Sequence, residues 1–318
     1  MNYLKLIKKA KNIALFSHSS PDPDTVGSVI AIYNALEKQG KIVDMFCEDN
    51  IPEIYNFLAE TKKYNEKTFN KENYDLLVAV DVAGNNMLGK FQEDFDSHEN
   101  TLRLDHHIKG ELEAKVNVVK IYSACSILIY ETIKGLKVKI DSSISTPLYF
   151  ALCGDTGLFR NNNTDSKSFK VASELLELGA DIRKVYSEFF DKKTVPYLKL
   201  TSNTLLNAEI NDEYGFVIMT AATKDFEKFG VSSSESVGNL ANTYLNCGYK
   251  ISAILKEKED GFHGSFRSKF EYDCSEIAKV FGGGGHKNAS GFLIEKSLKD
   301  AVKDVREAIT NYLKENKG

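Results

Sequence analysis

The chain has 318 residues, of which 42% are hydrophobic and 27% are charged, and its formal net charge is −4. This composition is typical of a globular protein and excludes a disordered chain. The length favours two domains of roughly 150 residues each. A negative net charge excludes a basic protein that coats long nucleic acids.

No apolar run approaches the roughly 20 residues that a membrane-spanning helix needs. The first apolar stretch, residues 13–16, is also too short for the core of a signal peptide. The five cysteines lie far apart without a Cys-x-x-Cys pair, which argues against a disulfide framework and a thiolate zinc site. We therefore expect a cytoplasmic protein that does not enter a membrane.

Residues 1–190 alternate between strand and helix patterns. Residues 75–80 form a nearly continuous apolar run, which is typical of a strand buried on both faces of a parallel sheet. The other expected strands are residues 12–17, 41–47 and 101–105. The expected helices are residues 25–38, 51–59, 123–134, 142–153, 166–178 and 182–190. This alternation predicts an α/β domain over residues 1–190, with an open, mostly parallel sheet flanked by helices.

The pattern changes after residue 190. Residues 191–205 resemble a linker that enters a helix, with Pro196 near its first turn. Residues 206–318 predict a smaller C-terminal α+β domain. Its expected elements are hairpins within residues 207–220 and 249–268, a glycine-rich stretch, a strand at 289–294 and a helix at 298–314.

Side chains able to bind metal ions follow three of the predicted strands directly. They are His18, Asp22, Asp24, Asp81, His106 and His107. Because parallel strands end at the same edge of a sheet, we expect these side chains to converge there. Asp155, which follows a predicted helix, is a further candidate.

Carboxylates that crowd together repel one another, and at pH 7 some would have to take up protons. A bound divalent cation removes this problem. Carboxylate and imidazole ligands without a thiolate suit Mn²⁺ better than a structural zinc ion. Five or more ligands are too many for one tetrahedral ion, so we infer two ions bridged by Asp81. Paired ions are typical of phosphoryl hydrolysis, in which a bridging water loses a proton and attacks phosphorus.

Each residue also has a simpler interpretation when it is taken alone. Asp24 is a preferred type of helix cap, Asp22 and Asp155 are common turn residues, and Asp81 is a plausible loop acid. The two adjacent histidines suit a solvated pair. All of these interpretations would have to hold together at sites that the predicted sheet makes neighbours.

The C-terminal domain offers a second candidate site at residues 282–286. Glycines such as Gly283, Gly284 and Gly285 allow a ligand to approach the backbone, whose N–H groups can hold a phosphate. His286 would add a donor. Arg267, followed by Ser268, suits a two-pronged contact with a phosphate.

Five motifs occur in one order along most of the chain: residues 18–24, 79–81, 105–107, 153–157 and 282–286. With them the sequence resembles the DHH phosphoesterases that carry a DHH-associated C-terminal domain, and among these the nanoRNase/pAp phosphatase group. The resemblance implies one Mn²⁺ on His18, Asp22 and Asp81, and another on Asp24, Asp81, His106 and Asp155. It implies that His107 faces the substrate phosphate, that Asp105 supports the histidines, and that Arg267 and His286 grip the nucleotide.

The implied reactions are hydrolysis of very short RNAs to mononucleotides and 3′-dephosphorylation of adenosine 3′,5′-bisphosphate (pAp) to AMP. The expected partners are therefore short oligoribonucleotides or small nucleotides, and neither membranes nor long duplexes. Three alternative functions stay open: hydrolysis of linear pApA, a pyrophosphatase activity, and nucleotide binding without catalysis. Whether the protein is a homodimer also stays open. Relatives often carry an aromatic residue after the position of Arg160, a candidate substrate contact, where this chain has Asn161, Asn162 and Asn163.

Overall fold

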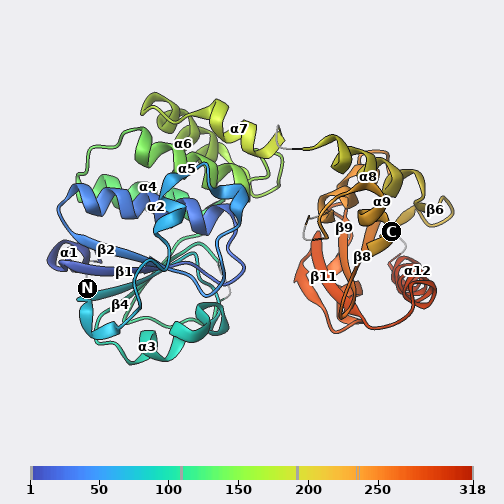
Figure 1. Cartoon of the computed structure of the whole chain (residues 1–318), viewed down its shortest axis with the longest axis horizontal. Helices are drawn as coiled ribbons and strands as arrows, with labels where there is room; N and C mark the ends of the chain where they lie inside the picture. Colours follow the sequence, from blue (N-terminus) through green and yellow to red (C-terminus); the bar gives the residue numbers. More distant parts are fainter. Residues whose placement is uncertain (1–2, 108–109, 191–192, 234, 236, 317–318) are drawn as a thin grey trace. The chain divides into compact units, whose positions relative to one another are not determined.

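A computed structural model describes residues 3–107, 110–190, 193–233, 235 and 237–316 (Figure 1). The chain divides into two compact units, Met1–Lys192 and Lys193–Gly318. Each unit has its own sheet and its own hydrophobic core. Within the described ranges, no helix is both long enough and apolar enough to cross a membrane.

Unit 1 contains a five-stranded sheet in which every pair of neighbouring strands is parallel. The strand order is β2-β1-β3-β4-β5, with the bounds β1 Asn12–Phe16, β2 Ile42–Phe46, β3 Leu76–Val80, β4 Thr101–Asp105 and β5 Val116–Val119. All five residues of β3 are buried, as the apolar run predicts. The predicted α/β class and parallel sheet are confirmed.

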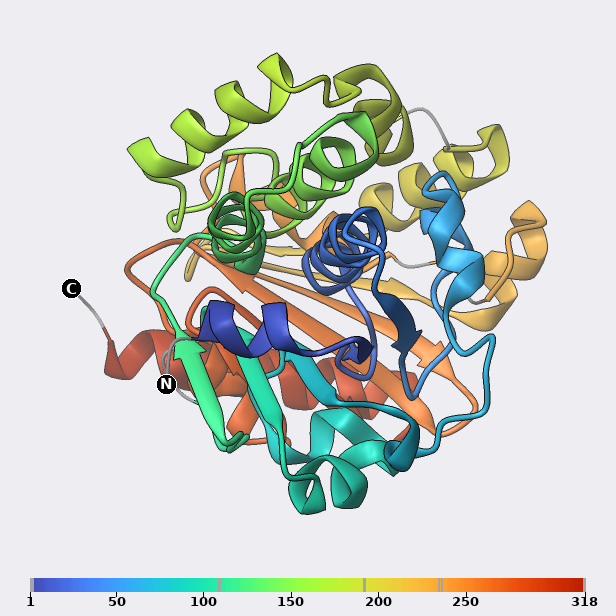
Figure 2. The same ribbon diagram turned by 90° about the vertical axis from the view of Figure 1, so that its left-hand side faces the viewer.

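Helices cover both faces of this sheet (Figures 1 and 2). The longer helices α2 and α4 lie on one face with α5, and the short α3 lies on the other, where an aromatic cluster around Phe16 and Phe46 packs. The helices are α1 Tyr3–Lys9, α2 Pro23–Lys38, α3 Gln92–Ser97, α4 Cys125–Leu136, α5 Ser142–Asp155, α6 Ser166–Glu177 and α7 Ile182–Phe190.

The two central helices of this layer, α2 and α5, pack unusually close together. A Cβ atom on Gly27 of α2 would lie 2.4 Å from the carbonyl oxygen of Pro147 in α5. A Cβ atom on Gly154 would lie 2.5 Å from Cβ of Pro23 at the start of α2. Pro147 cannot bond the carbonyl of Ser143, and Asn34 of α2 donates to that carbonyl instead, at 2.8 Å. The contacts of Gly27 and Gly154 hold the middle and the end of α5 against the beginning of α2, and the Asn34 hydrogen bond joins the second half of α2 to the beginning of α5.

The predicted helix at residues 51–59 was wrong, because the segment forms no α-helix. In place of one short α-helix, the chain forms two 3₁₀ turns, η1 Glu53–Tyr55 and η2 Ala59–Lys63. The apolar side chains of this segment still pack on the core, since Tyr55 and Phe57 contact Phe150 and Leu58 is buried, but the backbone forms short 3₁₀ turns and no continuous α-helix. Two further 3₁₀ segments are η3 Lys71–Asn73 and η4 Asn85–Phe91. The sequence patterns also missed α1, α3 and the edge strand β5.

Unit 2 contains a mixed six-stranded sheet in the order β10-β11-β9-β8-β7-β6. Both predicted hairpins are antiparallel pairs, and β7 and β8 are parallel. The strands are β6 Glu209–Asn211, β7 Phe216–Ala221, β8 Ile251–Lys258, β9 Gly261–Ser268, β10 Gly284–His286 and β11 Ala289–Ile294. The helices are α8 Val195–Leu206, α9 Thr223–Phe229, η5 Gly238–Leu240, α10 Ala241–Leu245, α11 Cys274–Lys279 and α12 Leu298–Glu315.

The predicted linker spans residues 191–205. Residues 191 and 192 lie outside the described part of the chain, and most of the remainder is helix α8. Its buried residue Leu200 packs in a cluster with Val217 and Phe226 of unit 2. Helix α8 is therefore part of the core of unit 2.

The close packing of α2 on α5 yields a stability prediction. Gly27→Ala should lower the free energy of unfolding by about 1–3 kcal/mol, because the new methyl group meets backbone that cannot move aside. Gly135→Ala in α4 is the matched control, since its methyl would meet only the flexible tip of Leu4. Urea denaturation of both variants measures the difference, and equal stabilities would contradict this account of the packing.

Candidate metal centre

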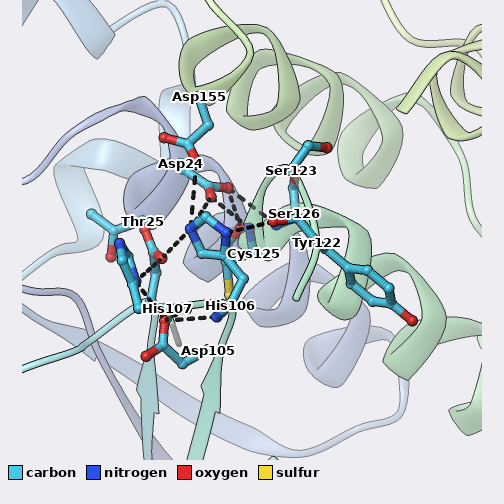
Figure 3. A network of polar contacts seen from close by, with 12 residues as sticks. Asp24, Thr25, Asp105, His106, His107, Tyr122, Ser123, Cys125, Ser126 and Asp155 are labelled. Carbon is cyan, nitrogen blue, oxygen red and sulfur yellow. Dashed lines mark hydrogen bonds and ion pairs between the residues drawn. The ribbon is translucent and has the colours of Figure 1, made fainter. Parts of the chain in front are cut away.

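The metal-competent side chains of unit 1 converge at one edge of the parallel sheet. Figure 3 shows four of them, Asp24, His106, His107 and Asp155. His18 follows β1, Asp81 follows β3, and His106 and His107 follow β4. The first turn of α2 and the last residue of α5 complete the cluster. Three groups of ligand atoms each lie within 4.8 Å of one another: His18, Asp22 and Asp81; Asp24, His106 and Asp155; and Asp81, His106 and His107.

Hydrogen bonds to main-chain carbonyls fix the tautomers of two of these histidines. His18 Nδ1 lies 2.6 Å from the carbonyl oxygen of Ser19, and His106 Nδ1 lies 2.9 Å from that of Tyr122. A carbonyl only accepts, so each Nδ1 carries the proton in the neutral ring. Each Nε2 therefore presents a lone pair.

Those lone pairs face carboxylate oxygens, which are also acceptors. His106 Nε2 lies 3.4 Å from Asp81 Oδ1, 3.4 Å from Asp155 Oδ2 and 3.7 Å from Asp24 Oδ2. His106 Nε2 and Asp81 Oδ1 are both buried without a hydrogen-bond partner among the described residues. Buried acceptors that face one another require a cation or protons between them. The oxygen and imidazole donor set therefore fits a divalent metal ion.

Asp24 is fully enclosed and is held from a second helix. Its carboxylate accepts hydrogen bonds from the backbone N–H groups of Cys125, at 2.6 Å, and Ser126, at 3.1 Å, in the first turn of α4. Figure 3 shows these bonds. The cap of α2 is Asp22, which accepts from the N–H groups of Asp24 and Thr25. Asp24 therefore does not cap α2, which leaves its carboxylate directed at the cluster.

Asp81 has a backbone conformation that is rare for its residue type. Its φ angle is +62°, in the left-handed region that favours glycine. Its N–H donates to the carbonyl oxygen of Leu104 at 2.9 Å, so the residue stays tied to β4. Non-glycine residues in this region cost free energy and are concentrated at functional sites.

Carboxyl groups of the cluster have shifted pKa values, because they are buried and close to one another. Burial raises the pKa of Asp24 and Asp81 well above the ordinary value, and the surrounding carboxylates raise it further. Burial lowers the pKa of His18, but the hydrogen bond and charge of Asp22 outweigh burial and the net pKa is raised. Burial raises the pKa of Asp22, but His18 outweighs it and the net pKa is lowered.

Asp155 is held in place by the segment that departs from the sequence pattern of the family. The side-chain amides of Asn161 and Asn163 donate to the main-chain carbonyl of Asp155, at 3.0 and 3.1 Å. Asn163 also donates to the carbonyl oxygen of Ser123, just before α4. The two asparagines thus position the end of α5, and sequence reasoning assigned them no such task.

Asp105 and His107 form a pair within the cluster. His107 Nδ1 lies 2.8 Å from Asp105 Oδ1, and this hydrogen bond raises the pKa of His107. Burial raises the pKa of Asp105, but the hydrogen bonds and charges of His107 and Arg103 outweigh burial and lower it to about 2. Asp105 is therefore ionised and supports His107, whereas its fully buried side chain is too enclosed to reach a substrate.

The candidate substrate residues lie on both units. In unit 1, Arg160 is exposed on the loop that follows α5. In unit 2, Arg267 lies on β9 and its Nη1 donates to the carbonyl oxygen of Phe266. The buried Ser268 hydroxyl lies 2.8 Å from the carbonyl oxygen of Tyr272 and accepts from Asn288, so the fold already engages it.

The expected glycine loop is in part an edge strand. Gly284 and Gly285 belong to β10, which pairs with β11. Gly283 and Gly285 pack so closely on β11 that a Cβ atom would lie 2.2 and 2.7 Å from main-chain oxygens. His286 ends β10, but its side chain lies outside the described part of the chain.

Comparisons with known proteins agree with this geometry. Residues 12–152 match the DHH family, N-terminal domain, and residues 214–315 match the DHHA1 domain. The chain therefore carries a DHH N-terminal domain followed by a DHHA1 domain. This confirms the resemblance seen in the sequence, and the family together with the acidic and histidine cluster makes the chain a metal-dependent phosphoesterase.

Similar full-length proteins carry a specific name. The bifunctional oligoribonuclease and PAP phosphatase NrnA of Thermus thermophilus is 27% identical over 95% of this chain and 90% of the relative. The protein of the same name from Bacillus subtilis is 25% identical, with 91% of each chain covered. The crystal structure of an exopolyphosphatase-related protein from Bacteroides fragilis has a TM-score of 0.92 at 24% identity, covering 99% of this chain and 96% of that one. The fold is thus shared along nearly the whole length.

The pKa directions predict how pH acts on the metal-free protein. Asp24 and Asp81 keep protons in the folded state above the pKa of about 3.9 that they have when unfolded, and His18 and His107 do the same above about 6.5. The folded state then binds more protons, so stability should fall as pH rises from about 5 to about 8. Asp22 and Asp105 have lowered pKa values and add no slope in this range.

Thermal unfolding with and without Mn²⁺ checks this prediction. Mn²⁺ should raise the melting temperature more at about pH 8 than at about pH 5, because the ion competes with protons for the same ligands. At a concentration 100 times its dissociation constant, the ion should add about 2.7 kcal/mol. Asp81→Asn should flatten the pH slope and weaken the effect of Mn²⁺. A melting temperature unmoved by Mn²⁺ in the wild-type protein would contradict the metal assignment.

The asparagine contacts predict an effect on metal affinity. Asn163→Ala should weaken Mn²⁺ binding by about ten-fold, because it removes one of the two amide donors to the carbonyl of Asp155 and the hydrogen bond that ties this segment to Ser123. Asn162→Ala is the matched control, since its side chain has no hydrogen bond among the described residues. Isothermal titration calorimetry measures both affinities, and equal values in the two variants would show that the contact is irrelevant to the site.

Proposed function

We propose that this protein is a manganese-dependent phosphoesterase of the cytoplasm that hydrolyses very short oligoribonucleotides to mononucleotides and converts pAp to AMP. The observation that carries the proposal is the buried contact between His106 Nε2 and Asp81 Oδ1, two acceptors 3.4 Å apart within a cluster of four carboxylates. The substrate class is supported by the name of the relatives in Thermus thermophilus and Bacillus subtilis.

The ligand sets of the proposal follow the proximity of the side chains. One ion would be held by His18, Asp22 and Asp81, and the second by Asp24, Asp81, His106 and Asp155. Asp81 would contribute to both sets, since its two oxygens face His18 and His106. Bound there, the ions supply a water of lowered pKa and positive charge opposite the phosphate.

Other side chains are proposed to bind the phosphate and the nucleotide of the substrate. His107 holds a proton on Nδ1 for Asp105, and its raised pKa favours the cationic form that attracts a phosphate oxygen. Asp105 keeps that ring oriented and, being ionised, stabilises its charge. Arg267, with Gly283, Gly284, Gly285 and His286 of unit 2, is the proposed contact for the second phosphate or the sugar of a nucleotide.

A substrate panel assayed with Mn²⁺ tests the proposal. The wild-type protein should hydrolyse a diribonucleotide and pAp, and should act poorly on pyrophosphate and on long single-stranded RNA. Asp81→Asn should reduce kcat by about 1,000-fold, equivalent to about 4 kcal/mol of transition-state stabilisation. Arg267→Met should mainly raise KM, whereas Arg306→Met, which removes a surface ion pair of unit 2 with Glu209, should change neither constant.

The outcomes separate the alternatives. Turnover of linear pApA far above that of the other two substrates would assign the protein to that reaction instead. Comparable turnover of pyrophosphate would indicate a pyrophosphatase. Tight binding of oligonucleotide without cleavage at saturating Mn²⁺ would indicate a binding protein, and an unchanged kcat in Asp81→Asn would overturn the proposed centre. Gel filtration of the same protein decides whether it is a homodimer.

A further inference from the structure

A buried arginine lies behind the catalytic edge of the sheet, and no motif of the sequence pointed to it. Arg103 lies on β4, two residues before Asp105, so both side chains project to the same face of the sheet. Only 4% of Arg103 is exposed, and Asp105 is fully buried. A guanidinium in such a place has to have its charge and its N–H groups satisfied by fixed partners.

The partners of the guanidinium are all supplied by its own neighbourhood. Nε donates to Asp105 Oδ2 at 3.1 Å, and Nη2 donates to the same oxygen. Nη1 donates to the carbonyl oxygen of Leu112 at 2.9 Å. The side chain is therefore tied at three of its atoms and cannot swing away from Asp105.

The two oxygens of Asp105 have separate tasks. Oδ2 is taken by Arg103, whereas Oδ1 accepts three N–H groups of the turn that follows β4. These donors are the backbone N–H groups of His106, at 2.7 Å, and His107, at 3.2 Å, and the ring Nδ1 of His107, at 2.8 Å. A carboxylate fixed through one oxygen can no longer rotate, so the direction of the other oxygen is also fixed.

Gly110 packs directly against the guanidinium of Arg103. A Cβ atom on Gly110 would lie 2.2 Å from Arg103 Nη2 and 2.6 Å from the carbonyl oxygen of Ala83. The guanidinium nitrogen and this carbonyl oxygen together leave no room for a side chain at residue 110.

We propose that Arg103 is a positioning residue for the phosphoester reaction: by fixing Asp105 it orients the imidazole of His107, with Nδ1 as donor to Asp105 and Nε2 as the atom offered to the substrate phosphate. The claim rests on the proposed function of His107. It differs from a merely structural role, in which Arg103 would neutralise a buried carboxylate and leave the folded enzyme's rate unaffected.

Kinetics of Arg103→Met distinguish the two roles. A displaced catalytic group costs about 100-fold in rate, so kcat should fall by about that factor while KM for a diribonucleotide changes by less than about three-fold. Mn²⁺ affinity, measured by calorimetry, should stay close to that of the wild-type protein. Arg306→Met is the control, because it removes another arginine–carboxylate pair, in unit 2, and should leave kcat unchanged.

Arg103→Met leaves the buried carboxylate of Asp105 without its cationic partner, which can unfold the protein. A second variant therefore tests the proposal without removing a charge. Gly110→Ala keeps every charge and crowds the guanidinium, together with the carbonyl oxygen of Ala83, and it should lower kcat in the same direction. Arg103→Lys should restore the melting temperature more fully than kcat, because one ammonium cannot reproduce the fork of contacts.

Nitrogen-15 NMR of the metal-free protein provides a readout that does not depend on turnover. The wild-type protein should show a hydrogen-bonded Nδ1 proton for His107, and this signal should shift or vanish in Arg103→Met and Gly110→Ala. An unchanged His107 signal together with an unchanged kcat in folded variants would overturn the proposal and leave Arg103 a structural residue. If the wild-type protein hydrolyses no substrate, the proposed function fails, but the NMR comparison still decides whether Arg103 orients His107.

Discussion

The buried opposition of acceptor atoms is the constraint on which the rest of unit 1 depends. His106 Nε2 and Asp81 Oδ1 lie 3.4 Å apart without hydrogen-bond partners among the described residues, and further carboxylates surround them. A protein interior tolerates such an arrangement only when a cation or protons relieve it. The same repulsion that destabilises the metal-free fold gives the site its affinity for a divalent ion, because binding the ion removes the repulsion.

The fold enforces this opposition through contacts that lie away from the ligands. Two close approaches, at Gly27 and Gly154, bring α5 against α2 and so place Asp155 near Asp24. The first turn of α4 donates two N–H groups to Asp24, and a helix N-terminus favours negative charge there. The hydroxyl of Thr25 donates to the carbonyl oxygen of Val80 and ties α2 to the end of β3. Rigid elements therefore position each ligand.

The two adjacent histidines after β4 have different hydrogen-bond partners. His106 has its Nδ1 proton held by a carbonyl, which directs its Nε2 lone pair at the metal cluster. His107 has its Nδ1 proton held by a carboxylate, which favours a charged ring suited to a phosphate. Adjacent histidines thus acquire different chemistry from different acceptors. Arg103 completes the arrangement, because an ionised Asp105 in the interior requires a positive partner.

The sequence by itself determined the fold class and predicted which side chains meet at one edge of the sheet. Apolar runs of strand length alternating with helical patterns indicate a parallel sheet, and in such a sheet side chains that follow the strands share one edge. His18, Asp81 and His106 could therefore be predicted as neighbours although they are far apart in the chain. The two hairpins of unit 2 could also be predicted from the sequence, because turn residues separate their strands.

Only the tertiary structure decided which task each polar residue has. Asp22 and Asp24 are both of a residue type that caps helices, and the structure shows that Asp22 caps α2 while Asp24 accepts hydrogen bonds from the first turn of α4 and faces the cluster. Arg103, Gly110 and Asn163 carry no local signal, since their roles consist of contacts with residues distant in sequence or of space left for another side chain. Periodicity reports which face of an element is buried, but the partner that a buried polar group meets is set by three-dimensional packing.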